Sequence, residues 1–114
     1  MSFAAPLQSS DQLWVELWVS LASLLRSYTA VHGLNGNRQA LVELGEEIIL
    51  VRHGDDWLKL SRTGARIDWR RADGSSGLLE FTEAGRLRPV SAEEAPQEEE
   101  MDMMAEAWAR ELML

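Results

Sequence analysis

The side chains best suited to chemistry in this chain surround His53. Gly54, Asp55 and Asp56 follow this histidine directly, at the corner of a predicted hairpin. An imidazole with two nearby carboxylates can bind a divalent metal, so His53, Asp55 and Asp56 are minor metal candidates. Tight turns also need glycine and aspartate for backbone reasons, and we favour that structural interpretation. The sequence therefore predicts no metal and no other cofactor.

Motifs of the common catalytic sites are absent from the sequence. The chain has no cysteine, which excludes a thiolate nucleophile, a disulfide and a cysteine-bound zinc. No nucleophile elbow, phosphate-binding loop, dinucleotide-binding glycine pattern or zinc-protease motif occurs. Glu98, Glu99 and Glu100 fit the N-terminus of a helix, and an acidic cation-binding ridge is the lesser alternative. These observations lean away from an enzyme.

A possible polar ligand row, Arg52, Trp57 and Arg70, is predicted on one face of a β-sheet. Two guanidinium groups beside an indole could stack a base or bind a carboxylate. Such pairs are also an ordinary way to complete an exposed sheet face, which is the interpretation we favour. The net charge of −8 repels phosphate, so no nucleic-acid binding through these residues and Arg66 is expected.

Two helices and an intervening sheet must position these residues. Apolar residues recur at spacings of three and four after Ser9 and Gln12, which form a capping-box pattern, so a helix is expected over 10–32. An acidic connection over 91–95 leads to a second, amphipathic helix over 96–113.

Residues 40–90 change to a period of two, in short apolar runs separated by glycine-containing turns. This pattern predicts an antiparallel meander of four to five strands. Assuming two-residue turns, Val42 is expected opposite Ile49 and Trp57 opposite Arg70. The fold class is α+β, in a single domain of 114 residues. One face of the sheet should collect Val42, Ile49, Val51, Leu58, Leu60, Ile67, Trp69, Leu79 and Phe81.

The first predicted helix is more apolar than one contact with a sheet requires. Such a contact needs an apolar stripe about a third of the circumference wide, yet Val15, Val19 and Ala22 add apolar surface on another side. The outer face of the sheet also carries apolar residues. Either placement of the two helices leaves apolar area uncovered, so a twofold homodimer is expected. The predicted interaction surface is Trp14, Trp18, Leu41, Ile48, Leu50, Met104 and Trp108.

These observations favour a non-enzymatic protein-interaction or scaffold module, which pairs with itself or with another protein. The alternative is a small-molecule or metal-binding domain with a pocket between the first helix and the sheet, lined by tryptophans and served by His53, Asp55 and Asp56. The apolar run 13–25 is interrupted and too short to cross a bilayer, and no signal-peptide pattern precedes it. No membrane association and a cytoplasmic location are therefore expected.

Overall fold

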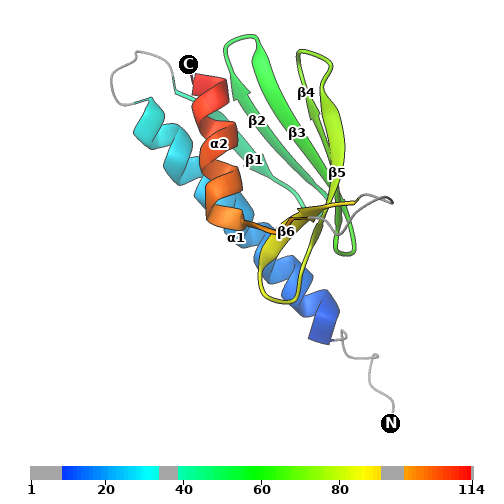
Figure 1. Ribbon diagram of the computed structural model, residues 1–114. Helices are drawn as coiled ribbons and strands as arrows, with labels where there is room; N and C mark the ends of the chain where they lie inside the picture. The colour runs from blue at the N-terminus through cyan, green and yellow to red at the C-terminus, as the bar shows by residue number, and fades with distance from the viewer. Residues whose placement is uncertain (1–8, 34–38, 91–96, 114) are drawn as a thin grey trace.

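The computed structural model describes residues 9–33, 39–90 and 97–113. The chain forms helix α1 (Ser9–His32), an antiparallel sheet and helix α2 (Met101–Met113), which is the predicted α+β order (Figure 1). The sheet has seven strands, more than the four to five predicted, in simple chain order. The strands are β1 (Leu41–Leu44), β2 (Ile48–His53), β3 (Asp56–Thr63), β4 (Arg66–Arg71), β5 (Ser76–Phe81), β6 (Arg86–Pro89) and β7 (Glu99–Glu100).

The register of the meander differs from the predicted one at three of its turns. Val42 lies opposite Val51 instead of Ile49, because the turn between β1 and β2 is centred one residue later than predicted, at residues 46–47, where Gly45 N donates to the Ile48 carbonyl at 2.7 Å. Arg70 lies opposite Lys59 instead of Trp57. The turn between β3 and β4 is centred one residue later than predicted, at residues 64–65, and its first residue is a glycine with a φ of 60°. The turn between β4 and β5 is also shorter than predicted, so Trp69 pairs with Gly77 rather than Phe81.

These register shifts leave the two faces of the sheet as predicted. Each shift is an even number of residues, and side chains alternate between faces with a period of two, so no residue changes side. The inner face forms the core with the helices. Its fully buried or nearly buried apolar members are Ile49, Val51, Leu58, Leu60, Ile67, Leu79, Phe81 and Leu87.

Both helices lie on the inner face of the sheet, side by side (Figure 1). The unusually apolar α1 therefore has two neighbours in its own chain: it packs on the sheet and also against α2. Trp18 and Trp108 are buried in this core, so the prediction that they belong to an interaction surface is wrong. Trp14 and Met104 are half-buried and pack against the same core. The rings of Trp14 and Phe81 are stacked, with their centres 6.3 Å apart.

Helix α2 begins at Met101, five residues later than the predicted start at residue 96. The two preceding glutamates form β7 and pair with β6, where Leu87 lies opposite Glu99 and Arg86 opposite Glu100. The exposed edge of β6 offers unpaired backbone groups, which explains why these residues extend the sheet rather than the helix. The predicted acidic connection over 91–95 lies outside the described residues. Within the described part of the chain, no helix has the length and apolar character needed to cross a membrane.

Candidate functional site

Within residues 9–33, 39–90 and 97–113, no helix or strand covers the face of the sheet turned away from both helices, and we call this the outer face. Its residues alternate with the buried residues of the inner face along the six longer strands. They are Leu41, Glu43, Ile48, Leu50, Arg52, Trp57, Lys59, Ser61, Thr63, Arg66, Asp68, Arg70, Ser76, Leu78, Glu80, Arg86 and Arg88.

Apolar side chains of the outer face remain accessible. Leu41 is 53% exposed, Ile48 43% and Leu78 47%. Leu50 and Trp57 are half-buried. Two predicted surface residues, Leu41 and Ile48, are thus exposed on the same side of the molecule as Leu50.

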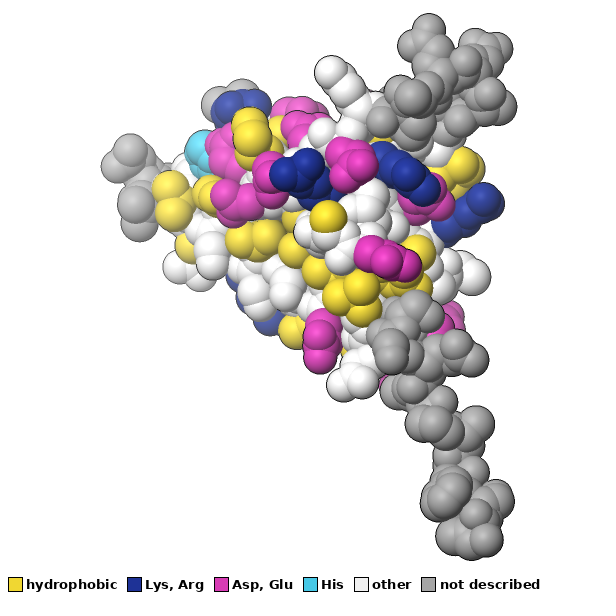
Figure 2. Space-filling model, turned by 60° about the horizontal axis from the view of Figure 1, so that its bottom comes forward, with side chains coloured by type: hydrophobic (Ala, Val, Ile, Leu, Met, Phe, Trp, Pro, Cys, Tyr) yellow, Lys and Arg dark blue, Asp and Glu magenta, His cyan; other side chains and the backbone are white. Residues whose placement is uncertain are grey.

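Large exposed hydrophobic side chains are not confined to the outer face. In the space-filling view of Figure 2, hydrophobic side chains reach the surface in several groups, with acidic and basic side chains between them. On α1, Val15 and Val19 are exposed on the side away from the core. Together, the exposed large hydrophobic residues of the described chain are Val15, Val19, Val31, Leu41, Leu44, Ile48, Leu78 and Met103.

The outer face is relatively basic in an acidic chain. Its basic residues outnumber its acidic ones, although the whole chain carries a net charge of −8. On the six longer strands the basic residues are Arg52, Lys59, Arg66, Arg70, Arg86 and Arg88, and the acidic residues are Glu43, Asp68 and Glu80. Lys59 lies directly opposite Arg70, and like charges in this position are mildly unfavourable.

Ion pairs of different length and exposure lie on the outer face. Arg52 approaches Glu43 to 2.8 Å and Arg88 approaches Glu80 to 2.7 Å. The Arg70–Asp68 pair is longer, at 3.7 Å, and its side chains are 67% and 44% exposed. Exposed pairs of this kind contribute about 0–1 kcal/mol, so Arg70 and Asp68 can turn toward another partner at little cost.

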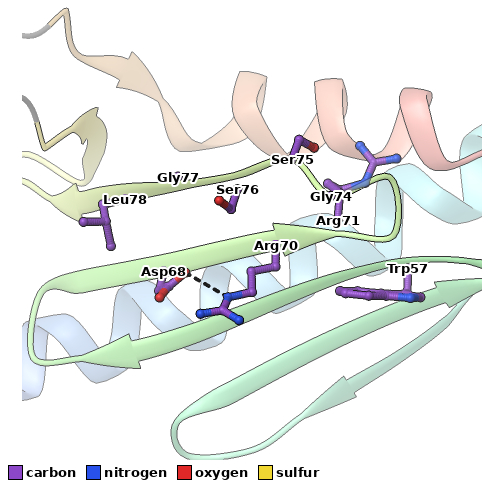
Figure 3. Close-up of a pocket in the computed structure, with 9 residues that line it drawn as sticks. All are labelled: Trp57, Asp68, Arg70, Arg71, Gly74, Ser75, Ser76, Gly77 and Leu78. Carbon is purple, nitrogen blue, oxygen red and sulfur yellow. Dashed lines mark ion pairs between the residues drawn. The ribbon is translucent and has the colours of Figure 1, made fainter.

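A shallow trough of about 440 Å³ crosses the outer face over β3, β4 and β5. Figure 3 shows Trp57, Asp68, Arg70 and Leu78 projecting on the side of the sheet away from the helices, which lie behind it. Arg52 is opposite Trp57, as predicted, but the register does not place Trp57 between two guanidinium groups. Trp57 and Arg70 instead line the same trough.

The turn between β4 and β5 closes one end of the trough. Asp73 accepts hydrogen bonds from the backbone and hydroxyl of Ser75, at 2.8 and 2.6 Å. These donors stabilise the carboxylate and hold the pKa of Asp73 below its ordinary value. Gly74, with a φ of 93°, supplies the left-handed backbone between them.

Two of the three minor metal candidates, His53 and Asp56, have structural partners. His53 Nδ1 lies 2.9 Å from the carbonyl of Leu112 in α2. Asp56 accepts hydrogen bonds from Arg71, at 3.1 Å, and from the backbone of Trp57. Over the described residues, no group of three His, Cys, Asp or Glu side chains is placed to hold a metal ion. His53 thus connects β2 with α2, and Asp56 connects β3 with Arg71 of β4.

Sequence reasoning missed the role of Arg71, which is only 9% exposed on the inner face. Besides Asp56, its guanidinium contacts Glu111 of α2 at 2.9 Å. The alternation along β4 was the available signal, because it places Arg71 on the same side as the apolar Ile67 and Trp69.

A second hollow, of about 500 Å³, lies between α1 and the turn that joins β1 to β2. Val15, Val19 and Leu44 contribute its apolar lining, with Trp18 and Arg62 beside them. Trp18 Nε1 donates to the carbonyl of the turn residue Gly45 at 2.9 Å, and the Arg62 guanidinium lies 5.7 Å from the centre of the Trp18 ring. Trp18 is the one tryptophan among the residues that line this hollow, and His53, Asp55 and Asp56 are not among them.

Comparisons with protein-family models, with curated proteins and with solved structures found no match to this chain.

Proposed function

We propose that this chain is a non-enzymatic protein-interaction module that docks through the outer face of its sheet. The observation that carries the proposal is the placement of both helices on one side of the sheet, which leaves Leu41, Ile48 and Leu78 exposed on the other side. Ile48 adjoins the half-buried Leu50 on β2, whereas Leu41 and Leu78 lie apart from this pair. Exposed apolar side chains bordered by polar residues on one face are a mark of protein-binding sites.

The dimensions of the outer face suit a protein partner. With about 4.8 Å between strands and about 3.3 Å per residue, six strands give a face on the order of 25 by 20 Å in projection. Side-chain relief brings its accessible area toward the ~800 Å² per partner of a standard protein interface. Mixed apolar and charged composition is also typical of such interfaces.

Site-specific photo-crosslinking in the native cell tests this proposal. A photoreactive residue is placed at Ile48 on the outer face or, as a matched control, at Val19 on α1, since the two side chains are 43% and 44% exposed. We expect discrete protein adducts from position 48 and few from position 19. Absence of adducts at position 48, or equal adducts at both positions, would contradict docking through the outer face.

The hollow between α1 and the sheet supports a second candidate function, the binding of a small apolar molecule. Its lining is mostly apolar, and the Arg62 Nε is buried without a hydrogen-bond partner among the described residues. An apolar chain that ends in a carboxylate would fill the hollow and provide an acceptor for this group. Titration calorimetry with octanoate tests the idea. We expect a heat of binding with the wild type and none with Val15→Asp. If octanoate gives no heat of binding with the wild type, this ligand class is excluded.

A further inference from the structure

We infer that the partner of the outer face is a second copy of this chain, packed face to face about a twofold axis. This inference rests on the proposed function, because it names the partner for the same surface. It starts from the observed register, which arranges the outer-face residues in straight rows across the strands.

Two neighbouring rows lie at the centre of the outer face, one on each side of a line through Ile49, Leu60, Trp69 and Gly77. The first row is Glu43, Leu50, Lys59, Arg70 and Ser76. The second row is Ile48, Ser61, Asp68 and Leu78.

Consider two copies whose outer faces lie against each other, with a twofold axis midway between the two sheets and parallel to this central line. This axis places the first row of one copy over the second row of the other. Each strand then lies antiparallel over its own equivalent, within the roughly 30° that aligned sheets adopt. Leu50 meets Ile48 of the second copy, which is an apolar pair. Arg70 meets Asp68 of the second copy, which is an opposite-charge pair. Because the axis is twofold, each pair occurs twice.

The ionic contacts on the outer face favour this arrangement over other self-pairings. The in-chain Arg70–Asp68 contact is long and exposed, so both side chains are free to exchange partners across the axis. In the dimer, Asp68 of the second copy would approach the pair of cations formed by Lys59 and Arg70 and relieve their repulsion. A twofold axis parallel to the strands, between β3 and β4, would instead bring Lys59 of one copy over Arg70 of the other. This arrangement is disfavoured because both side chains are positively charged.

Charge-swap variants test the inference with light scattering and sedimentation over a range of concentrations. We expect a wild-type dimer. In Arg70→Asp two carboxylates meet across the axis, and in Asp68→Arg two guanidinium groups meet, so each variant should raise the dissociation constant about tenfold or more. The double variant Asp68→Arg/Arg70→Asp restores opposite charges and should dimerise. An equimolar mixture of the two single variants should form a heterodimer.

Arg110→Asp is the matched control for Arg70→Asp, because it makes the same change in charge. It breaks an exposed ion pair with Glu106 on α2, on the other side of the sheet. It should leave dimerisation unchanged. Circular dichroism of each variant checks that the fold persists, and the heterodimer from two weakened variants is an outcome that a folding defect cannot produce.

The outcomes separate this inference from the proposed function. A wild type that stays monomeric at all concentrations, or a dimer that survives both single substitutions, would overturn the inference. If position 48 then crosslinks to a different protein, the outer face still docks a partner and only the identity of that partner is wrong. If position 48 crosslinks to nothing, the proposed function fails as well.

Discussion

The indole of Trp69 lies against Gly77, its partner on the neighbouring strand β5, so closely that a Cβ on Gly77 would fall 2.6 Å from Trp69 Nε1. The same indole is tilted against Trp108 of α2, with ring centres 6.2 Å apart. Trp69 therefore fills the space between the sheet and α2, and the missing side chain at Gly77 makes room for it.

A methyl group at position 77 should destabilise the fold. Gly77→Ala would force the Trp69 ring away from its site or shift β5, and overpacking of this kind costs about 1–3 kcal/mol. Urea denaturation measures the change in the free energy of unfolding. Ser76→Ala, at the adjacent exposed position, is the control and should change it by no more than about 0.5 kcal/mol. Equal stability of Gly77→Ala and the wild type would show that Trp69 moves without cost.

Helix α2 should stabilise the chain mainly through Trp108. Trp108 is buried between α2, the sheet and α1, so Trp108→Ala leaves a cavity and should lower the free energy of unfolding by about 3–5 kcal/mol. Met103, on the same helix, is 60% exposed, and Met103→Ala should cost no more than about 0.5 kcal/mol. Similar losses from both substitutions would contradict the packing of α2 on the core.

Arg71 should stabilise the fold through the buried aliphatic part of its side chain as well as through its charge. Arg71→Ala removes both, whereas Arg71→Met keeps an unbranched apolar side chain in the same place. The partner carboxylates of Asp56 and Glu111 are 37% and 58% exposed, so both can be hydrated after the guanidinium is lost. We expect a larger loss of stability from Arg71→Ala than from Arg71→Met in urea denaturation. The reverse order would show that the ion pairs dominate.

The sequence predicts the faces of the sheet better than the partners across it. Alternation alone places Ile49, Leu60 and Trp69 on the inner face, and an error of two residues in a turn does not alter that result. The partner across the strand depends on the position and length of each turn. Val42 and Arg70 therefore face Val51 and Lys59, although neither pairing was predicted.

Tertiary packing decides the features that local patterns leave open. The apolar excess of α1 was correctly recognised, but α2 covers much of it within the same chain, and Trp18 and Trp108 are thereby buried. The Glu99–Glu100 strand forms because β6 presents a free edge, which a window of sequence around these residues does not reveal. His53 likewise gains its partner in α2 from a residue far away in the chain.

The contact between α1 and α2 should make the titration of Tyr28 unusual. The Tyr28 hydroxyl donates to Asp102 at 2.7 Å, and this hydrogen bond is the main reason that the pKa of Tyr28 lies above its ordinary value of 10.0. Burial and the negative charges of Asp102 and Glu106 act in the same direction. Because the folded-state pKa is the higher one, the stabilisation is complete below pH 10 and is lost as the pH rises through the folded-state pKa.

Tyrosinate absorbance should follow this group directly, because Tyr28 is the only tyrosine of the chain. We expect a midpoint above 10.0 in the wild type and a lower midpoint in Asp102→Asn, which removes the negative charge next to the hydroxyl. Asp73→Asn, in the turn between β4 and β5, is the control and should leave the midpoint unchanged. Tyr28→Phe should remove the part of the alkaline loss of stability that this hydrogen bond causes. A wild-type midpoint at or below 10.0 would mean that the bond between α1 and α2 does not persist in solution.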